Sequence, residues 1–201
     1  MTLGCDAHGH KVKVRCNRWR KCPGCSLFKQ WEIKQRFEAG IDNVPDDRYP
    51  AFVTLTFPKH RAPDEEEAHK CLRKLIGRLR YRGDVGEYGW VLQRQENGTL
   101  HYHGIWHMRW YADGLVTWRN LVEKSGFGTQ QHIRDAERDD ARYCARYLSQ
   151  RLAELTPMRR AYSFSRGYPL APSKVAWLKE KQEVAALGVP DDCEWRPLPY
   201  G

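Results

Sequence analysis

Two histidines in one strand-like segment are the first residues whose types and spacing could do chemistry. His101 and His103 flank Tyr102 in a segment, residues 100–106, with the composition of a β-strand. Side chains alternate between the two faces of a strand, so both imidazoles project from the same side. A divalent metal held by them could polarise a phosphate oxygen. By itself, an H-x-H pair is more often a solvated sheet face, and His107 shares that face near the strand end.

A third metal ligand is expected from the neighbouring strand, residues 88–95, and Gln93 is the preferred candidate. The choice depends on the hairpin loop that contains Asn97 and Gly98. A two-residue turn would pair Gln93 with Tyr102, on the wrong face, whereas a three-residue loop with a left-handed Gly98 would pair it with His101. Glu96 is the alternative ligand.

Two tyrosines one helical turn apart form a second reactive group. Tyr143 and Tyr147 lie with Arg146 in a segment, 137–155, that has helical periodicity. They lie roughly opposite an apolar stripe made of Ala141, Ala145, Leu148, Leu152 and Leu155. A phenol can attack a phosphodiester when cations offset the developing charge. Arg146 would hold the phosphate with its planar guanidinium, and its alternative is a surface ion pair.

The first 40 residues are rich in cysteines and basic residues. Cys16, Cys22 and Cys25 have spacing typical of a zinc site. Cys5 is the preferred fourth ligand, and His8 and His10 remain alternatives. The residues expected to contact nucleic acid are Arg18, Trp19, Arg20 and Lys21 in this segment and Arg94 beside Gln93. Trp19 and Trp31 could equally dock the module onto the rest of the chain.

Composition narrows the class of partner. The chain has 201 residues, a formal net charge of +9 and a pI near 9.3, which favour a polyanion and above all nucleic acid. No apolar run approaches the roughly 18 residues that a membrane span needs, so a cytoplasmic protein without membrane contact is expected.

The order of expected elements is β-α-β-β-α-β-α between residues 51 and 155. Strands are expected at 51–57, 88–95, 100–106 and near 129–133, and helices at 64–82, 115–124 and 137–155. Residues 1–40 are interpreted as a zinc-binding module, 38–50 as a linker and 51–155 as the main domain. Residues 156–201 are interpreted as an extension that packs on this domain or extends a DNA path, with one helix at 174–187.

Three motifs in this order resemble those of the HUH endonuclease superfamily. They are Phe52-Val-Thr-Leu-Thr-Phe57, His101-Tyr-His103 and Tyr143-x-x-Arg-Tyr147. The paired tyrosines resemble the two-tyrosine branch, which includes the gene A replication proteins of isometric single-stranded DNA phages. The resemblance covers about residues 51–155.

This resemblance implies an α+β fold of the HUH type, with an RRM- or ferredoxin-like palm. In that fold a central five-stranded antiparallel sheet is flanked by helices, and here the zinc-binding module precedes it. His101 and His103 would be ligands of Mg²⁺ or Mn²⁺, with Tyr143 and Tyr147 as nucleophiles. The sequence departs from the family where Gln93 replaces an acidic ligand and Arg146 replaces Lys. An amide oxygen binds a hard cation more weakly than a carboxylate does.

The expected function is site-specific nicking and joining of single-stranded DNA through a 5′-phosphotyrosine. It would initiate rolling-circle replication of a phage or plasmid in the cytoplasm of a prokaryotic host, with host helicase and polymerase as further partners. A rolling-circle transposase would use the same chemistry. A zinc-containing DNA-binding regulator without catalysis is the alternative from another class, and it would never become covalently attached to DNA.

Overall fold

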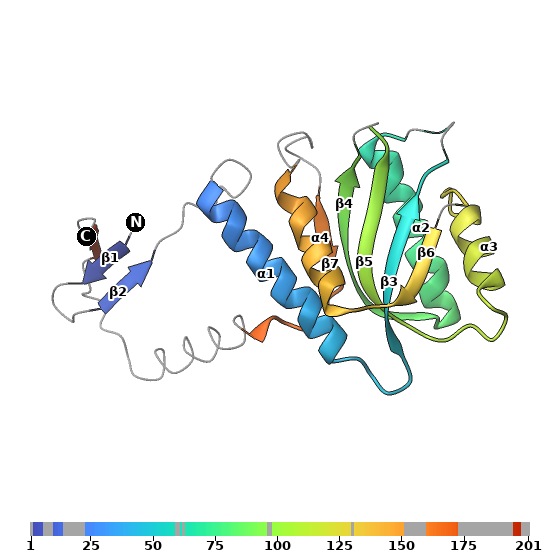
Figure 1. Ribbon diagram of the computed structural model, residues 1–201, viewed down its shortest axis with the longest axis horizontal. Helices are drawn as coiled ribbons and strands as arrows, with labels where there is room; N and C mark the ends of the chain where they lie inside the picture. Colours follow the sequence, from blue (N-terminus) through green and yellow to red (C-terminus); the bar gives the residue numbers. More distant parts are fainter. Residues whose placement is uncertain are drawn as a thin grey trace.

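The structure is a computed structural model (Figure 1). It describes the backbone of residues 2–5, 10–13, 23–58, 61, 63–95, 98–129, 131–150, 160–172 and 195–197. It describes the side chains of residues 26–58, 61, 63–95, 98–129, 131–146 and 160–172. Within these ranges, none of the helices combines the length and the apolar character needed to cross a bilayer.

Five antiparallel strands form the main sheet, in the order β6-β3-β5-β4-β7 (Figure 1). The strands are β3 (Tyr49–Thr56), β4 (Val85–Arg94), β5 (Leu100–Met108), β6 (Gln131–Asp135) and β7 (Tyr162–Phe164). The central strand β5 is buried along its whole length, because both faces of the sheet are covered. The expected α+β class, with a five-stranded antiparallel sheet flanked by helices, is confirmed.

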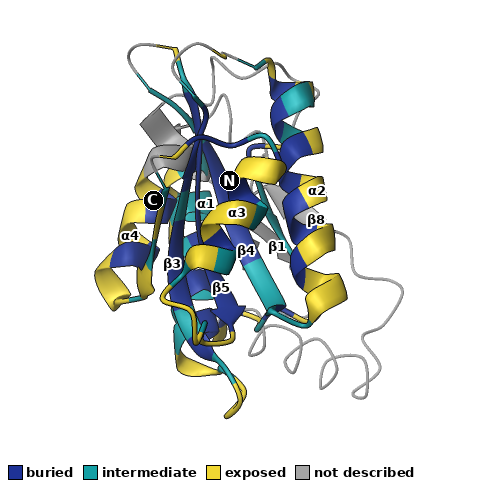
Figure 2. Cartoon of the chain, turned by 90° about the vertical axis from the view of Figure 1, so that its right-hand side faces the viewer, coloured by how far each residue is buried: buried dark blue, intermediate teal, exposed yellow. Residues whose placement is uncertain are grey.

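Four helices cover the two faces of this sheet. Helices α1 (Pro23–Asp42) and α4 (Arg138–Gln150) pack together and against β5. Helices α2 (Glu65–Arg82) and α3 (Val116–Lys124) pack together, and α2 contacts β4. His107 of β5 bonds to α1, while Tyr102 of β5 bonds to α2, so the two helix pairs lie on opposite faces. Figure 2 shows their buried residues turned toward the sheet and exposed residues turned outward.

Local sequence signals explain where α2 begins and ends. The side chain of Asp64 accepts a hydrogen bond of 2.8 Å from the backbone N–H of Glu67, and Gly83 ends the helix in the left-handed conformation, at φ 75°. Acidic residues fill the first turn, where the helix dipole favours them. The expected alternation of strands and helices from β3 to α4 is confirmed. The helix expected at 174–187 lies outside the described residues, as does the part of the predicted last helix beyond residue 150.

Helix α1 corrects the linker that was predicted at residues 38–50. The helix continues through Asp42, and its side chains Ile33 and Phe37 are fully buried in the core. The linker prediction rested partly on Gly40, because glycine disfavours helices. In the structure the missing Cβ of Gly40 instead leaves room for the side chain of Tyr168. A Cβ at this position would lie 1.9 Å from the hydroxyl of Tyr168, so only glycine lets that ring pack against α1. The carbonyl of Gly40, in the last turn, accepts a 2.8 Å hydrogen bond from Nε2 of His107.

The two ends of the chain meet in a second, three-stranded sheet with the order β2-β1-β8. Strand β1 (Thr2–Cys5) pairs with β2 (His10–Lys13) and with β8 (Trp195–Pro197), and both pairings are antiparallel. Strands β1, β2, β7 and β8 were not predicted from the sequence. Thus one strand of the C-terminal extension widens the main sheet, and another completes a sheet with the N-terminal hairpin.

Candidate active site

One face of the main sheet collects the polar residues that the motifs singled out. His101 pairs with Gln93 of β4 on one side and with Thr56 of β3 on the other, while His103 pairs with Thr54. Directly opposed residues of antiparallel strands share a face, so these side chains form one polar group. Helices α1 and α4 cover the same face.

The hairpin loop decides whether Gln93 reaches this group. Gln95 donates its backbone N–H to the carbonyl of Thr99 at 2.9 Å, which leaves three residues in the loop, and Gly98 has φ 81°. The three-residue alternative is therefore the correct register, and Gln93 pairs with His101. Its side-chain oxygen lies 2.9 Å from Nε2 of His103. The alternative ligand Glu96 lies outside the described residues.

His103 is held on both ring nitrogens. Nε2 faces the amide of Gln93, and Nδ1 lies 3.1 Å from Oγ1 of Thr54. The ring is 5% exposed, and burial, with the neighbouring His101 as a smaller cause, lowers the pKa of His103 to about 3. Burial also lowers the pKa of His101, whose ring centroid is 6.4 Å from that of His103. Both imidazoles are thus kept neutral, the form in which histidine binds a metal.

Two imidazoles and an amide oxygen could together hold a divalent cation. Two neighbouring ligands of an octahedral Mg²⁺ ion, each at about 2.1 Å, lie about 3 Å apart, and Nε2 of His103 and Oε1 of Gln93 are 2.9 Å apart. In one tautomer Nε2–H of His103 donates a hydrogen bond to Oε1 of Gln93. In the other, Nδ1–H donates to Thr54, and the lone pairs of Nε2 and Oε1 face each other and would suit a cation between them. Within the described residues, no cluster of three or more His, Cys, Asp and Glu side chains could hold a metal. The candidate set is two histidines with an amide.

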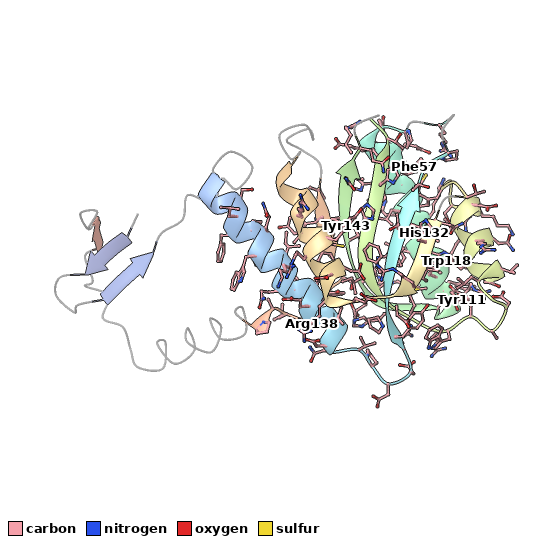
Figure 3. All side chains as sticks on the ribbon, viewed as in Figure 1. Phe57, Tyr111, Trp118, His132, Arg138 and Tyr143 are labelled. Atoms are coloured by element: carbon pink, nitrogen blue, oxygen red, sulfur yellow. The ribbon has the colours of Figure 1, made fainter. Side chains whose placement is uncertain are left out.

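Tyr143 of α4 lies over the same face (Figure 3). Its ring centroid is 5.1 Å from that of His103 at an interplanar angle of 89°, and 5.9 Å from that of Phe52 at 84°. The phenol is 38% exposed, so it contacts the histidine and is open to solvent. Ala141 and Ala145, which belong to the predicted apolar stripe of α4, are buried, and so is Cys144. The structure therefore brings the histidine motif and the first tyrosine together.

A group of residues that sequence reasoning missed fixes the start of α4. Asp140 is 6% exposed and accepts three hydrogen bonds: 2.8 and 2.6 Å from the guanidinium of Arg134, and 2.8 Å from the backbone N–H of Glu137. The same guanidinium lies 4.8 Å above the ring of Phe52, which contacts Tyr143. An acidic residue in a first helical turn is a readable signal. Its partner on β6 is visible only in the folded chain.

His132 of β6 extends the polar face to the edge of the sheet (Figure 3). It pairs with Thr54, which pairs in turn with His103, and its side chain is exposed. His107, the third histidine of β5, is instead buried and bonded to Gly40 of α1. The alternation of side chains along β5 places His107 on the same face as His101 and His103, and it does not indicate that His107 bonds to α1.

The remaining predicted site residues fall in three groups. Arg146 is exposed, and Arg94 bonds to the carbonyl of Gly98 at 3.0 Å and lies 3.7 Å from Glu65. For Tyr147 and Cys25 only the backbone is described, and for Cys5 the backbone pairs with that of His10. The predicted residues outside the described ranges are His8, Cys16, Arg18, Trp19, Arg20, Lys21 and Cys22.

Comparison with known proteins gives the class. The model of a family of replication-associated proteins, described by the name ORF2, matches residues 50–152, about half of the chain. The chain therefore belongs to this family. The match spans β3 to α4 and includes the histidine pair and both tyrosines. No curated protein and no solved structure matches the chain.

The family confirms the expectation of a replication-associated protein, which fits the role of a replication initiator. The HUH fold, the two-tyrosine branch, the zinc-binding module and the roles of individual residues remain predictions.

Proposed function

We propose that the protein nicks and rejoins single-stranded DNA at a specific site and so initiates rolling-circle replication of a phage or plasmid. The observation that carries the proposal is the contact between Tyr143 and His103 on a face that also holds His101 and Gln93. A phenol beside neutral imidazoles, in a basic protein of a replication-associated family, suits attack on a phosphodiester.

In the proposed reaction, the phenol oxygen of Tyr143 bonds to phosphorus while the bond between phosphorus and the 3′ oxygen breaks. The phenolic proton ends on that 3′ oxygen. The products are a 5′-phosphotyrosine and a free 3′-hydroxyl, which a polymerase can extend. Attack of a 3′-hydroxyl on the phosphotyrosine reverses the step and joins the strand. Tyr147, one turn later, would cleave the regenerated site and release a circle.

The surrounding residues would orient the phosphate and offset its charge. His101, His103 and Gln93 would hold Mg²⁺ or Mn²⁺, which when bound supplies Lewis-acid polarisation of a phosphate oxygen. Arg146, exposed on the same helix as Tyr143, would hold the phosphate through its guanidinium. Thr54 would fix the tautomer and orientation of the His103 ring through Nδ1.

The proposal extends to the N-terminal residues. Cys5, Cys16, Cys22 and Cys25 would bind a structural zinc ion, with His8 or His10 as alternatives to Cys5. Arg18, Trp19, Arg20 and Lys21, together with Arg94, would contact the DNA strand. Host helicase and polymerase would act after the nick.

The decisive experiment looks for the covalent intermediate. The full chain is incubated with Mn²⁺ and single-stranded oligonucleotides from its own genetic neighbourhood, and denaturing electrophoresis then detects a protein–DNA adduct. We expect an adduct that is lost when Tyr143→Phe and Tyr147→Phe are combined. Tyr81→Phe is the matched control, because this tyrosine is 94% exposed on α2, which covers the opposite face of the sheet.

The outcomes separate the enzyme from a DNA-binding regulator. A regulator binds the oligonucleotide with a strong dependence on salt but forms no adduct with any divalent metal. An adduct that persists in the double variant would place the nucleophile elsewhere. Either result would reject the site proposed here.

A further inference from the structure

A second site lies on the other face of the sheet. A cavity of about 350 Å³ opens between α2 and the edge formed by β4 and β7. Its wall includes Trp90 of β4 and Ser163 of β7, which pair with each other, and His69 of α2. Trp90 contacts Tyr102, which faces α2, so the cavity and the His103 site lie on opposite faces. Its volume is within the range of about 300–1,000 Å³ for small-ligand pockets.

The charges around this cavity favour the binding of an anion. Arg73 of α2 and Arg160, just before β7, both line it and both are exposed. A third guanidinium, that of Arg80, lies 5.0 Å above the ring of Tyr88, another wall residue. None of the described residues that line the cavity is acidic. Guanidinium groups favour phosphate because their donors match its oxygens in pairs.

The aromatic residues of the cavity wall favour a planar group next to a phosphate bound by the arginines. Trp90 and Tyr88 project from β4, and the ring centroids of Trp90 and His69 are 5.4 Å apart. His69 is fixed in turn by a 2.9 Å hydrogen bond between its Nδ1 and the hydroxyl of Tyr102. Trp90 is 7% exposed and Arg80 lies over the ring of Tyr88, so a nucleobase would contact the accessible edges of these rings. Such contacts do not read the identity of the base.

We propose that this cavity binds one nucleotide, with its phosphate at Arg73 and Arg160 and its base against Trp90 and Tyr88. The nucleotide is either part of a bound DNA strand or a free nucleotide, since both present the same chemistry. The site is separate from the candidate active site, and binding there requires neither a divalent metal nor cleavage. The proposal therefore stands or falls independently of the nicking reaction.

Calorimetric titration of the full chain, without divalent metal, tests this site. The probes are deoxyadenosine monophosphate, deoxyadenosine, inorganic phosphate and a short oligothymidine. We expect the monophosphate to bind about tenfold more tightly than the nucleoside or phosphate alone, because it uses both the cationic and the aromatic wall. The double variant Arg73→Gln with Arg160→Gln should weaken binding of the monophosphate by about tenfold or more.

Two further variants separate the cavity from general charge. Lys74→Gln with Arg119→Gln removes the same charge from exposed positions that do not line the cavity, and it should leave binding within about twofold. Ser163→Phe fills the cavity without removing a charge and should also abolish binding, with thermal unfolding as the check that the variant is folded.

The oligothymidine identifies the source of the nucleotide. Weaker oligothymidine binding in the Arg73 and Arg160 variant assigns the cavity to the DNA strand, and unchanged binding assigns it to a free nucleotide. No binding of the monophosphate to the unaltered chain would overturn the proposal. An equal loss in the Lys74 and Arg119 control would also overturn it.

Discussion

The carboxylate of Asp140 offers a direct test of how α4, and with it Tyr143, is held on the sheet. Asp140→Ala removes the acceptor of three hydrogen bonds, two from Arg134 and one from the backbone of Glu137. In the bond from Glu137, the side chain of the third helical residue, Asp140, accepts from the backbone N–H of the N-cap residue. This is one of the two hydrogen bonds of a capping box. The substitution therefore loosens the helix start and the contact between α4 and β6.

The expected loss of unfolding free energy follows from these contacts. Losing the hydrogen bond to the backbone N–H of Glu137 costs about 1 kcal/mol. The pair with Arg134 adds about 1 kcal/mol and no more, because that side chain is 51% exposed and water replaces part of the interaction. The sum is about 2 kcal/mol, which for a chain of this size lowers Tm by about 4–8 °C.

Urea unfolding followed by circular dichroism measures this loss. Asp139→Ala is the matched control, because this carboxylate is in the same turn but 87% exposed, and we expect a change within about 0.5 kcal/mol. A double-mutant cycle with Arg134→Met should give a coupling energy of about 1 kcal/mol. A loss for Asp140→Ala below about 0.5 kcal/mol, or a coupling near zero, would refute the reasoning.

Three further predictions concern the site and its support. Gln93→Glu should lower the Mn²⁺ concentration for half-maximal adduct formation by about tenfold, because a carboxylate is the stronger ligand for a hard cation; an unchanged requirement would exclude Gln93 as a ligand. Burial lowers the pKa of His107, so the unfolded chain binds more protons and stability should fall as pH drops below about 6.5. Urea unfolding at several pH values should show a shallower fall in His107→Gln, and an unaltered fall would contradict the assignment. Gly40→Ala should destabilise the fold by about 1–3 kcal/mol in the same assay, because its Cβ would overlap the hydroxyl of Tyr168; a negligible change would show that the ring moves aside.

The main sheet and its neighbouring helices could be predicted from the sequence because their signals are local. The apolar spacing of Leu72, Leu75 and Leu79 predicts α2, and its acidic first turn marks the start. Helix α1 was missed because it begins with Pro23 and Gly24 and carries a second glycine, Gly40, and both residue types usually indicate turns or helix ends. Glycine is required at position 40 because the ring of Tyr168 packs there. Tyr168 lies far along the chain, so no local sequence pattern indicates this contact.

For the candidate site, the sequence supplied the residues and a choice between two registers. Alternation along a strand put His101 and His103 on one face, and helical spacing grouped Tyr143 with Arg146. It could not choose between a two-residue and a three-residue loop, since Asn97 and Gly98 are compatible with both. The observed pairing of Gln93 with His101 resolves that choice.

By itself, then, the sequence determined the periodic elements, the chemical types at the site and the basic character that points to nucleic acid. Only the tertiary structure decided that Gln93 reaches His103, that Tyr143 lies against the same ring, and that Arg134 and Asp140 join α4 to the sheet. The physical reason is the range of the interactions. Periodicity arises from the geometry of a few successive residues, whereas these contacts join distant segments that meet only when burial of the whole core brings them together.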